Sequence, residues 1–257
     1  YPALNNIIGE IKQHAGHHDE ITGDVEALAD VEFVNQNPIG KSSRSNPATY
    51  VKAYDDIRML FAEQQLCKQF GFKPSYFSFN VPGGRCEECE GEGKIHIEMQ
   101  FMAAVQLICE SCKGKRFKED VLDVRFNGKN IIDILDLTID DAMEFFGRFQ
   151  GALERSIVRK LRPLFDVGMG YVKLGQPSST LSGGEAQRVK LATFLGIKKN
   201  ESLGKSTLFI FDEPTTGLHF HDISKLLYAF NALIKQGHSL IIIEHNADII
   251  KCADWVI

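Results

Sequence analysis

The amino-acid sequence predicts an α/β fold with two lobes, one built on parallel strands and the other rich in helices. Three observations support this. The short apolar runs Leu208–Phe211 and Leu240–Ile243 are strand-sized, and a stretch with helical periodicity joins them. Apolar residues at helical spacing fill much of residues 50–70 and 131–167. Two closely spaced pairs of cysteines separate these two helical regions.

The composition is that of an ordinary globular protein. The 257 residues include 44% hydrophobic and 25% charged residues, which excludes a disordered or fibrous chain. The formal net charge of −5 gives no sign of a nucleic-acid footprint, although one basic cluster follows the last paired cysteine. No apolar run is long enough to span a membrane and no secretory leader is present, so we expect a cytoplasmic protein. Because the chain starts at Tyr1 and stops within an apolar run, we expect a piece of a longer polypeptide.

The paired cysteines have the spacing of a metal site. Two residues separate Cys86 from Cys89 and Cys109 from Cys112, and 19 residues lie between the pairs. In a cytosolic chain this doubled spacing is typical of four thiolates around Zn²⁺, with each pair in a tight turn. Four cysteines close the coordination shell, so we expect a structural ion without an open catalytic position. The alternating segment 94–101 predicts a strand that leaves the first pair.

A predicted buried strand in the second half ends in two acids. Leu208–Phe211 runs directly into Asp212 and Glu213, and α/β folds bind ligands at the carboxyl ends of parallel strands. In a nucleotide hydrolase the first acid holds the Mg²⁺ shell and the second polarises the attacking water. The next predicted strand, at 239–243, leads to His245, whose imidazole could sense a phosphate.

A Ser-Gly-Gly turn opens a predicted helix upstream of these strands. Ser182 is a natural N-cap, and the backbone amides that follow it at Gly183 and Gly184 form an anion site. Apolar residues then recur at helical spacing as far as Gly196. A Gly-Gly pair by itself can be a simple turn, but its order and spacing relative to the two strands favour a nucleotide site.

Taken together, these motifs resemble the ATP-binding-cassette ATPases. Leu181–Gln187 resembles the signature sequence of that family, Leu208–Glu213 its Walker B strand and His245 its switch histidine. Asn35–Pro38 would supply the Q-loop, in which Gln36 contacts Mg²⁺ and water. More narrowly, the chain resembles the UvrA family of damage-recognition ATPases in bacterial nucleotide excision repair, because a zinc module lies between Q-loop and signature.

The resemblance implies a particular domain organisation. Residues 1–37 and 183–257 would form a partial P-loop nucleotide-binding lobe, and residues 38–182 a helix-rich signature lobe. The second lobe would carry the four-cysteine zinc module at about 84–118. The resemblance covers nearly the whole chain and corresponds to much of the family's C-terminal cassette.

The resemblance also implies roles for individual residues. Glu213, His245 and Gln36 would be catalytic, and Asp212 would serve the same bound nucleotide. The signature residues would contact the γ-phosphate on an opposing cassette; these are Ser182, Gly183, Gly184 and Gln187. The zinc ligands would be Cys86, Cys89, Cys109 and Cys112.

The Walker A loop, GxxxxGK[ST], is missing from the sequence. The tripeptides at 40–42 and 204–206 have its Gly-Lys-Ser ending, but Asn35 and Lys199 stand where the first glycine is required. The resemblance places this loop upstream of Tyr1. Without its lysine and backbone amides, we expect this chain by itself to bind ATP weakly and to hydrolyse it negligibly.

The resemblance implies ATP and Mg²⁺ as cofactors of the longer protein. Its partners would be damaged duplex DNA, a UvrB-type repair helicase and a second copy of the same protein. Candidate contacts to DNA phosphates are Arg44, Lys113, Lys115 and Arg116.

Two other functions are compatible with parts of the sequence. Cys86–Gly93 matches the zinc knuckle of DnaJ-type chaperones, which would make the chain a protein-interaction module without an ATPase role. Those chaperones lack the signature and Walker B residues, and they repeat the knuckle several times, whereas this chain has one full copy. A transporter cassette is disfavoured by the zinc module.

Overall fold

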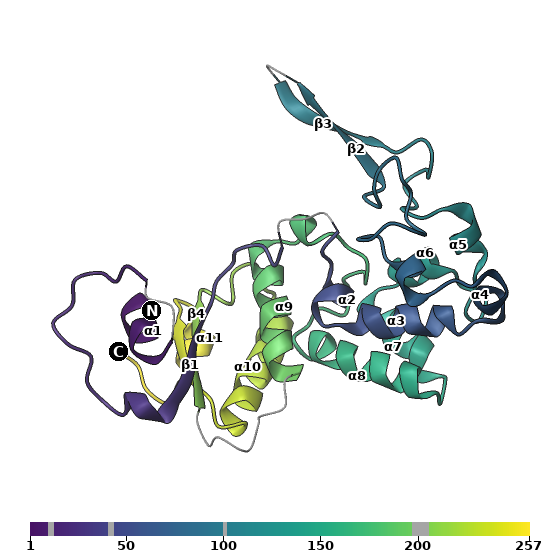
Figure 1. Ribbon diagram of the computed structural model, residues 1–257. Coiled ribbons are helices and arrows are strands. Elements are labelled where there is room, and N and C mark those ends of the chain that lie inside the picture. The colour runs from purple at the N-terminus through teal and green to yellow at the C-terminus, as the bar shows by residue number, and fades with distance from the viewer. Residues whose placement is uncertain (10–12, 41–43, 100–101, 197–205) are drawn as a thin grey trace. The chain divides into compact units, whose positions relative to one another are not determined.

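The computed structural model describes residues 1–9, 13–40, 44–99, 102–196 and 206–257 (Figure 1). These residues divide into two compact units. The first consists of Tyr1–Pro38, Asp166–Met169 and Ser182–Ile257, and the second of Ile39–Phe165 and Gly170–Leu181. The expected lobes differ from these units by the short segment 166–169 and by one residue at two boundaries. The Gly-Lys-Ser tripeptides at 40–42 and 204–206 fall partly outside the described residues.

The first unit is built on a parallel three-stranded sheet of order β1-β4-β5. Its strands are β1 (Leu28–Val34), β4 (Ser206–Asp212) and β5 (Ser239–Ile243). The strand pattern predicts β4 and β5, and both are confirmed. β1 is not predicted, because Asp30 and Glu32 interrupt its apolar residues. The register aligns the carboxyl ends of the three strands, so the residues that follow them meet at one edge.

Helices cover both sides of this sheet. α9 (Gly183–Gly196) and α10 (Phe220–Lys235) lie on one side, and α1 (Pro2–Ile8) lies on the other against β1 (Figure 1). α10 links β4 to β5 as the predicted parallel crossover. The short elements η1 (Val25–Ala27) and α11 (Ala247–Ile250) complete the unit.

The core of the first unit lies between the sheet and its two long helices. The ring of Phe211 packs 4.8 Å from that of Phe230 on α10, and the ring of Phe209 packs 4.8 Å from that of Phe194 on α9. Phe209 and Phe211 alternate with polar or half-exposed positions on β4, so burial of this face fixes the strand's orientation.

The second unit contains most of the described helices. They are α2 (Pro47–Tyr50), α3 (Ala53–Ala62), α4 (Gln65–Phe70), η2 (Pro74–Phe77), α5 (Glu119–Asp123), α6 (Ile131–Leu135), α7 (Ile139–Gly147), α8 (Ala152–Asp166) and η3 (Ser178–Thr180). The helical regions predicted at 50–70 and 131–167 are therefore confirmed, although each is divided into shorter helices. Thr138 caps α7 by accepting a hydrogen bond of 3.1 Å from the amide of Asp141. No helix among the described residues is long and apolar enough to span a membrane.

The sequence at 124–130 predicts a short strand that turns at Asn127 and Gly128; the turn is confirmed, but no strand forms around it. Asn127 and Gly128 take up φ angles of 46° and 82°, which makes a tight turn closed by a hydrogen bond of 2.9 Å from the Phe126 amide to the Lys129 carbonyl. Phe126 packs instead against the aromatic cluster of α7, including Phe145. The apolar residues of this segment thus serve the helical core rather than a sheet.

A two-stranded antiparallel hairpin belongs to the second unit (Figure 1). It consists of β2 (Lys94–Met99) and β3 (Met102–Ile108). β2 confirms the strand predicted after the first cysteine pair, as far as the described residues reach. The hairpin joins the two cysteine pairs, so its pairing register sets how these pairs face each other.

Candidate nucleotide-binding edge and metal centre

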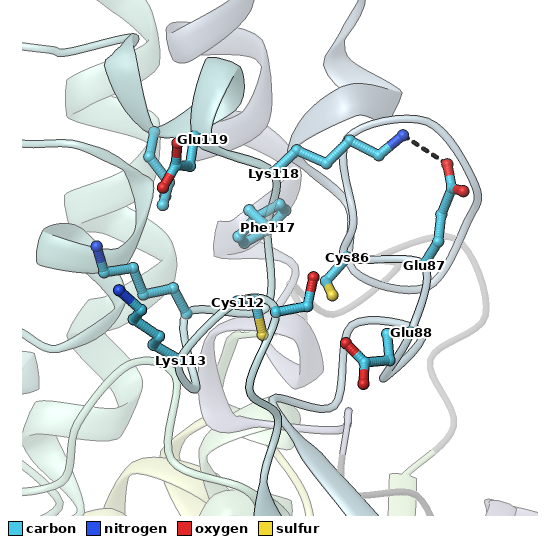
Figure 2. A pocket seen from close by; sticks show the side chains of 11 residues that line it. Cys86, Glu87, Glu88, Cys112, Lys113, Phe117, Lys118 and Glu119 are labelled. Atoms are coloured by element: carbon cyan, nitrogen blue, oxygen red, sulfur yellow. Dashed lines mark hydrogen bonds and ion pairs between the residues drawn. The ribbon is translucent and has the colours of Figure 1, made fainter.

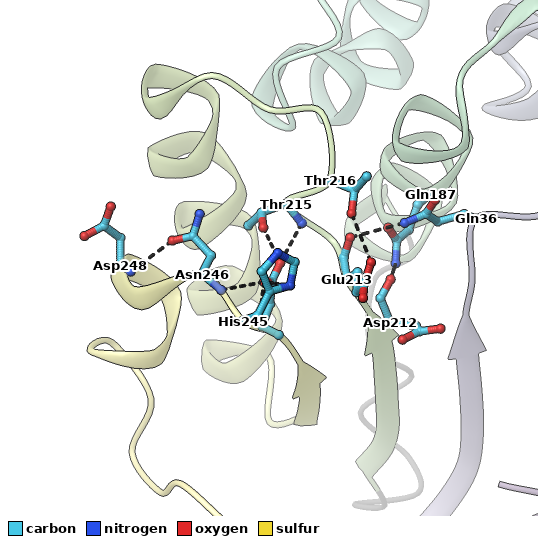
Figure 3. Close-up of polar contacts among 10 residues, drawn as sticks. Gln36, Gln187, Asp212, Glu213, Thr215, Thr216, His245, Asn246 and Asp248 are labelled. Atoms are coloured by element: carbon cyan, nitrogen blue, oxygen red, sulfur yellow. Dashed lines mark hydrogen bonds and ion pairs between the residues drawn. The ribbon is translucent and has the colours of Figure 1, made fainter.

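Four predicted site residues meet at the carboxyl edge of the first unit's sheet (Figure 3). Gln36 follows β1, Asp212 ends β4, Glu213 comes next, and His245 follows β5. The Nε2 of Gln36 donates a hydrogen bond of 3.3 Å to the carbonyl of Glu213, although 177 residues separate the two. The fold therefore brings Gln36 next to the acid pair at the end of β4.

The backbone of Glu213 is held in an unusual conformation. Its φ is 45°, in the left-handed region that a non-glycine residue adopts at a cost of about 1–3 kcal/mol. Its amide donates to the carbonyl of Ile243 at 2.9 Å, and its carbonyl accepts from the Thr216 amide at 3.1 Å as well as from Gln36. These hydrogen bonds fix the peptide, whereas the carboxylate is exposed at the edge; within the part of the chain that the structure describes, the Thr216 hydroxyl reaches it, at 3.5 Å.

The N-terminus of α9 closes with a reciprocal capping box. Glu185 Oε2 accepts hydrogen bonds from the Ser182 amide at 2.8 Å and from its hydroxyl at 3.0 Å, and Ser182 Oγ accepts from the Glu185 amide at 3.3 Å. A Cβ on Gly183 would lie 2.8 Å from Gln36 Oε1, and one on Gly184 would lie 2.8 Å from the Thr216 carbonyl. The two glycines thus allow the start of α9 to lie close to Gln36 and Thr216 at the sheet edge.

Gln187 lies inside the first unit, which differs from the expected contact with a phosphate. Its side chain is 2% exposed, and its Nε2 donates hydrogen bonds to the carbonyl of Val34 at 2.7 Å and to that of Asp212 at 3.2 Å. The two carbonyls lie at the ends of β1 and β4. The amide of Gln187 therefore holds neighbouring strand ends together, and in this structure it is not presented to an opposing molecule.

Glu244 is a residue at this edge that the sequence analysis did not single out. Its side chain is 2% exposed and accepts hydrogen bonds from the amides of Thr215, His245 and Asn246, and from the Thr215 hydroxyl. Burial by itself raises the pKa of Glu244, but these hydrogen bonds outweigh it and hold the pKa below its usual value. One signal in the sequence could have indicated Glu244: like Asp212 and Glu213, it is an acid at the carboxyl end of a predicted parallel strand.

His245 presents its imidazole to solvent. The side chain is 79% exposed, and its Nδ1 lies 3.8 Å from Oε2 of the buried Glu244. Its backbone amide is anchored, so the ring is free to meet a ligand while its main chain stays in place. The sequence patterns also did not indicate a contact between α9 and the residue after β1. Lys190 Nζ donates hydrogen bonds to the side-chain oxygen of Asn35 at 2.9 Å and to its carbonyl oxygen at 3.0 Å.

The four paired cysteines gather in the second unit. Their sulfur atoms all lie within 4.8 Å of one another, with 3.9 Å between those of Cys86 and Cys109 and 3.6 Å between those of Cys89 and Cys112. Four sulfurs at about 2.3 Å from a tetrahedral Zn²⁺ are about 3.8 Å apart, so this arrangement fits a zinc site with four thiolate ligands. The cysteines are buried and none forms a disulfide.

Both cysteine pairs sit in tight turns. The Glu92 amide donates to the Cys89 carbonyl, the Lys115 amide donates to the Cys112 carbonyl, both at 2.9 Å, and the Gly93 amide points at Cys89 Sγ from 3.2 Å. The residue after each pair has positive φ, 50° at both Glu90 and Lys113. The local sequence thus forms two similar turns that aim their sulfurs at a common point.

The proposed DNA-contacting residues divide into two kinds. Arg44 forms ion pairs with Glu90 at 3.3 Å and Glu92 at 3.5 Å, so its guanidinium is bound to the first cysteine turn. Arg116 lies over the ring of Phe79 at 5.7 Å, and burial lowers its pKa. Lys113 and Lys115, by contrast, are exposed. Only these two of the four have side chains positioned for a partner in solution.

A cavity of about 380 Å³ lies beside the cysteine cluster (Figure 2). Cys86 and Cys112 form part of its wall, and both acidic and basic side chains surround it. Lys118 donates a hydrogen bond of 2.5 Å to Glu87, which lowers the pKa of that carboxyl. The remaining lining residues are Glu88, Ser111, Lys113, Lys115, Phe117, Glu119 and Leu122.

The parallel sheet, the two acids and the glutamine at its carboxyl edge, and the glycine-rich start of α9 define the class of protein. It is part of an ATP-binding-cassette ATPase fold, joined to a helix-rich unit with a four-cysteine cluster. The chain is 50% identical over its whole length to UvrABC system protein A of Clostridium perfringens, and 52% identical over 99% of its length to that of Agrobacterium fabrum. The chain is thus similar along its whole length to one part of UvrABC system protein A.

The chain spans about a quarter of the length of these relatives, 26% for the Clostridium perfringens protein and 25% for the Agrobacterium fabrum protein. The crystal structure of UvrA2 from Deinococcus radiodurans matches 91% of the chain and 27% of its own, with a TM-score of 0.82 and 42% sequence identity. No protein-family model matches the chain. Similarity along the full chain leaves the chaperone-type zinc module unfavoured as an alternative.

Proposed function

We propose that this chain forms part of the ATP-hydrolysing cassette of a DNA-repair protein that acts in nucleotide excision repair. The observation that carries the proposal is the convergence of Gln36, Asp212, Glu213 and His245 at one sheet edge. The relatives that share half of its residues are named for the UvrABC system. Because the chain spans a quarter of their length, the activity is proposed for the longer protein that would contain it.

Each edge residue has a role that follows from its position. The Asp212 carboxylate, at the end of β4, would face the Mg²⁺ shell, and Mg·ATP would supply the phosphoryl group for transfer to water. The exposed carboxylate of Glu213 would accept the proton of the attacking water, and Gln36 would orient that water from the neighbouring strand. The solvent-facing imidazole of His245 would contact the γ-phosphate.

The phosphate cradle of this site would come from residues outside the 257 in hand, because the sequence contains no GxxxxGK[ST] loop. We therefore expect only weak binding when Mg·ATP is titrated into this chain by isothermal calorimetry. A sub-micromolar dissociation constant would contradict this expectation and show that the chain holds phosphates in another way.

The decisive test of the proposed function is Glu213→Gln in a polypeptide of the relatives' length that contains this segment. Loss of the general base should lower kcat for ATP hydrolysis about 100-fold or more while Mg·ATP still binds. Glu26→Gln, at an exposed position of the same unit, is the matched control and should keep the activity. Unchanged hydrolysis in the Glu213 variant would reject the assignment of this edge as the hydrolytic site.

The cysteine cluster would bind a structural Zn²⁺, and basic residues next to it would contact DNA. Zn²⁺ would be held by Cys86, Cys89, Cys109 and Cys112 and would fix the hairpin's base, as the sulfur geometry allows. Damaged duplex DNA, a UvrB-type repair helicase and a second copy of the protein would be the partners. Lys113 and Lys115 would contact DNA phosphates, since both are exposed.

Fluorescence anisotropy with duplex DNA tests the phosphate contacts. The double change Lys113→Ala and Lys115→Ala should weaken binding and reduce the slope of log K against log salt by about 2, one for each lost contact. Lys68→Ala, at an exposed position of the same unit, should leave the slope unchanged. Absence of any binding by the wild-type chain at about 50 mM salt would remove DNA contact from this segment.

A further inference from the structure

Glu244 joins the two loops that carry the proposed hydrolytic residues. We propose that Glu244 is a positioning residue for ATP hydrolysis, whose carboxylate locks the turn after Glu213 to the backbone of His245. This inference rests on the proposed function, since it concerns how the same edge is assembled (Figure 3).

The oxygens of Glu244 contact the loops that follow two neighbouring strands of the sheet. Oε1 accepts from the Thr215 amide at 2.8 Å and from the Thr215 hydroxyl. Oε2 accepts from the amide of His245 at 2.8 Å and from that of Asn246 at 2.9 Å. Thr215 follows β4 and lies 29 residues before Glu244, so one carboxylate ties the loop after β4 to the loop after β5.

The position of Thr215 makes this tie important for Glu213. Thr215 is buried, at 8% exposure, and lies two residues after Glu213. The left-handed backbone of Glu213 persists only while its surroundings hold it. The hydrogen bond from the Glu213 amide to Ile243 and the contact of Glu244 with Thr215 both connect this turn to the end of β5. Release of Thr215 would remove one of these two connections.

The chemistry of the contact favours a carboxylate for this task. A buried anion is costly unless donors surround it, and the basic side chain recorded within 4 Å of Glu244 among the described residues is the exposed imidazole of His245, at 3.8 Å. Four hydrogen bonds from uncharged donors satisfy the carboxylate instead, and hydrogen bonds to an ionised acceptor are stronger than neutral ones. An amide at this position would present an NH₂ group to donors.

Hydrogen exchange on the present chain tests whether the tie exists in solution. Glu244→Gln should speed the exchange of the amides of Thr215, His245 and Asn246, with Glu26→Gln as the control that leaves them unchanged. Equal protection of these amides in wild type and Glu244→Gln would overturn the proposal, whatever the activity of the longer protein.

ATP hydrolysis by a polypeptide of the relatives' length tests the positioning role. Because small displacements of reacting groups cost up to about 100-fold in rate, Glu244→Gln and Thr215→Val should each lower kcat about 10–100-fold. The KM for ATP should change less than about threefold, since no contact to nucleotide is removed. Thr215→Ser keeps the hydroxyl donor and should restore most of kcat, which a general loss of fold would not do.

The outcomes separate the two proposals. If Glu213→Gln hydrolyses ATP normally, the proposed function fails and the role of Glu244 fails with it. If Glu213→Gln is inactive while Glu244→Gln and Thr215→Val keep their kcat, only the positioning role is rejected. A rise in KM with unchanged kcat would also reject it, because the effect would then be on binding.

Discussion

The cysteine cluster and the sheet edge are two sites assembled in opposite ways. The four cysteines lie within 27 residues, and two similar turns joined by one hairpin bring their sulfurs together. The sheet edge draws on residues from Gln36 to His245 and depends on the register of three strands. The cysteine cluster can therefore be encoded by local spacing, whereas the sheet edge needs long-range contacts that spacing does not record.

The two sites also differ in what completes them. The cysteine cluster offers a full tetrahedral set of ligands from its own residues. The sheet edge offers carboxylates, a glutamine and an imidazole, but the sequence has no Walker A loop to hold a triphosphate. The first site would bind its ion by itself, and the second would bind its nucleotide only with further residues. This contrast can be tested by perturbing each site in turn.

The largest effect is expected at the cysteine cluster. Cys109→Ser should abolish stoichiometric zinc binding and unfold the hairpin's base, because structural zinc contributes about 10–16 kcal/mol to small metal-held modules. Metal analysis after purification and amide exchange of the two cysteine turns would measure this. Cys252→Ser, at an exposed cysteine outside the cluster, should bind zinc normally. One full equivalent of tightly bound zinc in Cys109→Ser would contradict the assignment of four cysteine ligands.

A smaller loss of stability is expected when the hydrogen bonds between Gln187 and the ends of β1 and β4 are removed. Gln187→Met keeps the side chain's length but leaves the carbonyls of Val34 and Asp212 without this donor, which should lower the free energy of unfolding by about 2–4 kcal/mol. Urea denaturation measures the loss. A change below about 0.5 kcal/mol would mean that Gln187 does not hold β1 to β4, and its expected contact with phosphate would regain support.

Crowding at the helix start should have a somewhat smaller effect. In Gly184→Ala the new Cβ would meet the Thr216 carbonyl at 2.8 Å, so we expect a loss of about 1–3 kcal/mol from overpacking. Gly16→Ala is the matched control in the same unit, because apart from its chain neighbours no atom of the described residues lies within 4 Å of its added Cβ. Equal stability of the two variants in thermal unfolding would show that α9 does not approach Thr216 so closely.

The smallest effect is a pH dependence from Glu244. Its pKa lies below the usual 4.5 in the folded chain, so its contribution to stability is fully present above about pH 4.5 and is lost as the pH falls through the folded value. At pH 7, Glu244→Gln should be about 1–2 kcal/mol less stable than wild type. Urea unfolding between pH 7 and pH 3 should show this difference shrinking. A difference that stays constant would exclude the ionised carboxylate as its source.

Local patterns in the sequence determined several features without help from tertiary structure. The doubled cysteine spacing defined the four-cysteine cluster, because two residues between ligands close a turn by themselves. Apolar runs defined β4 and β5, and Thr138 marked the start of α7 through a hydrogen bond to a residue three positions on. Each feature has a regular or short-range sequence pattern, such as paired cysteines, an apolar run or a capping residue, which spacing and periodicity capture.

Other features were decided only when distant segments packed together. β1 carries charged residues and becomes a strand because β4 offers it a parallel partner. Gln187 follows Gly183 and Gly184 in sequence, but burial turns its amide toward two strand ends. Glu244 stands beside His245 in the sequence, yet its partner Thr215 lies 29 residues away. Hydrogen bonds of buried polar groups depend on which segments meet, and that is set by the tertiary fold rather than by local pattern.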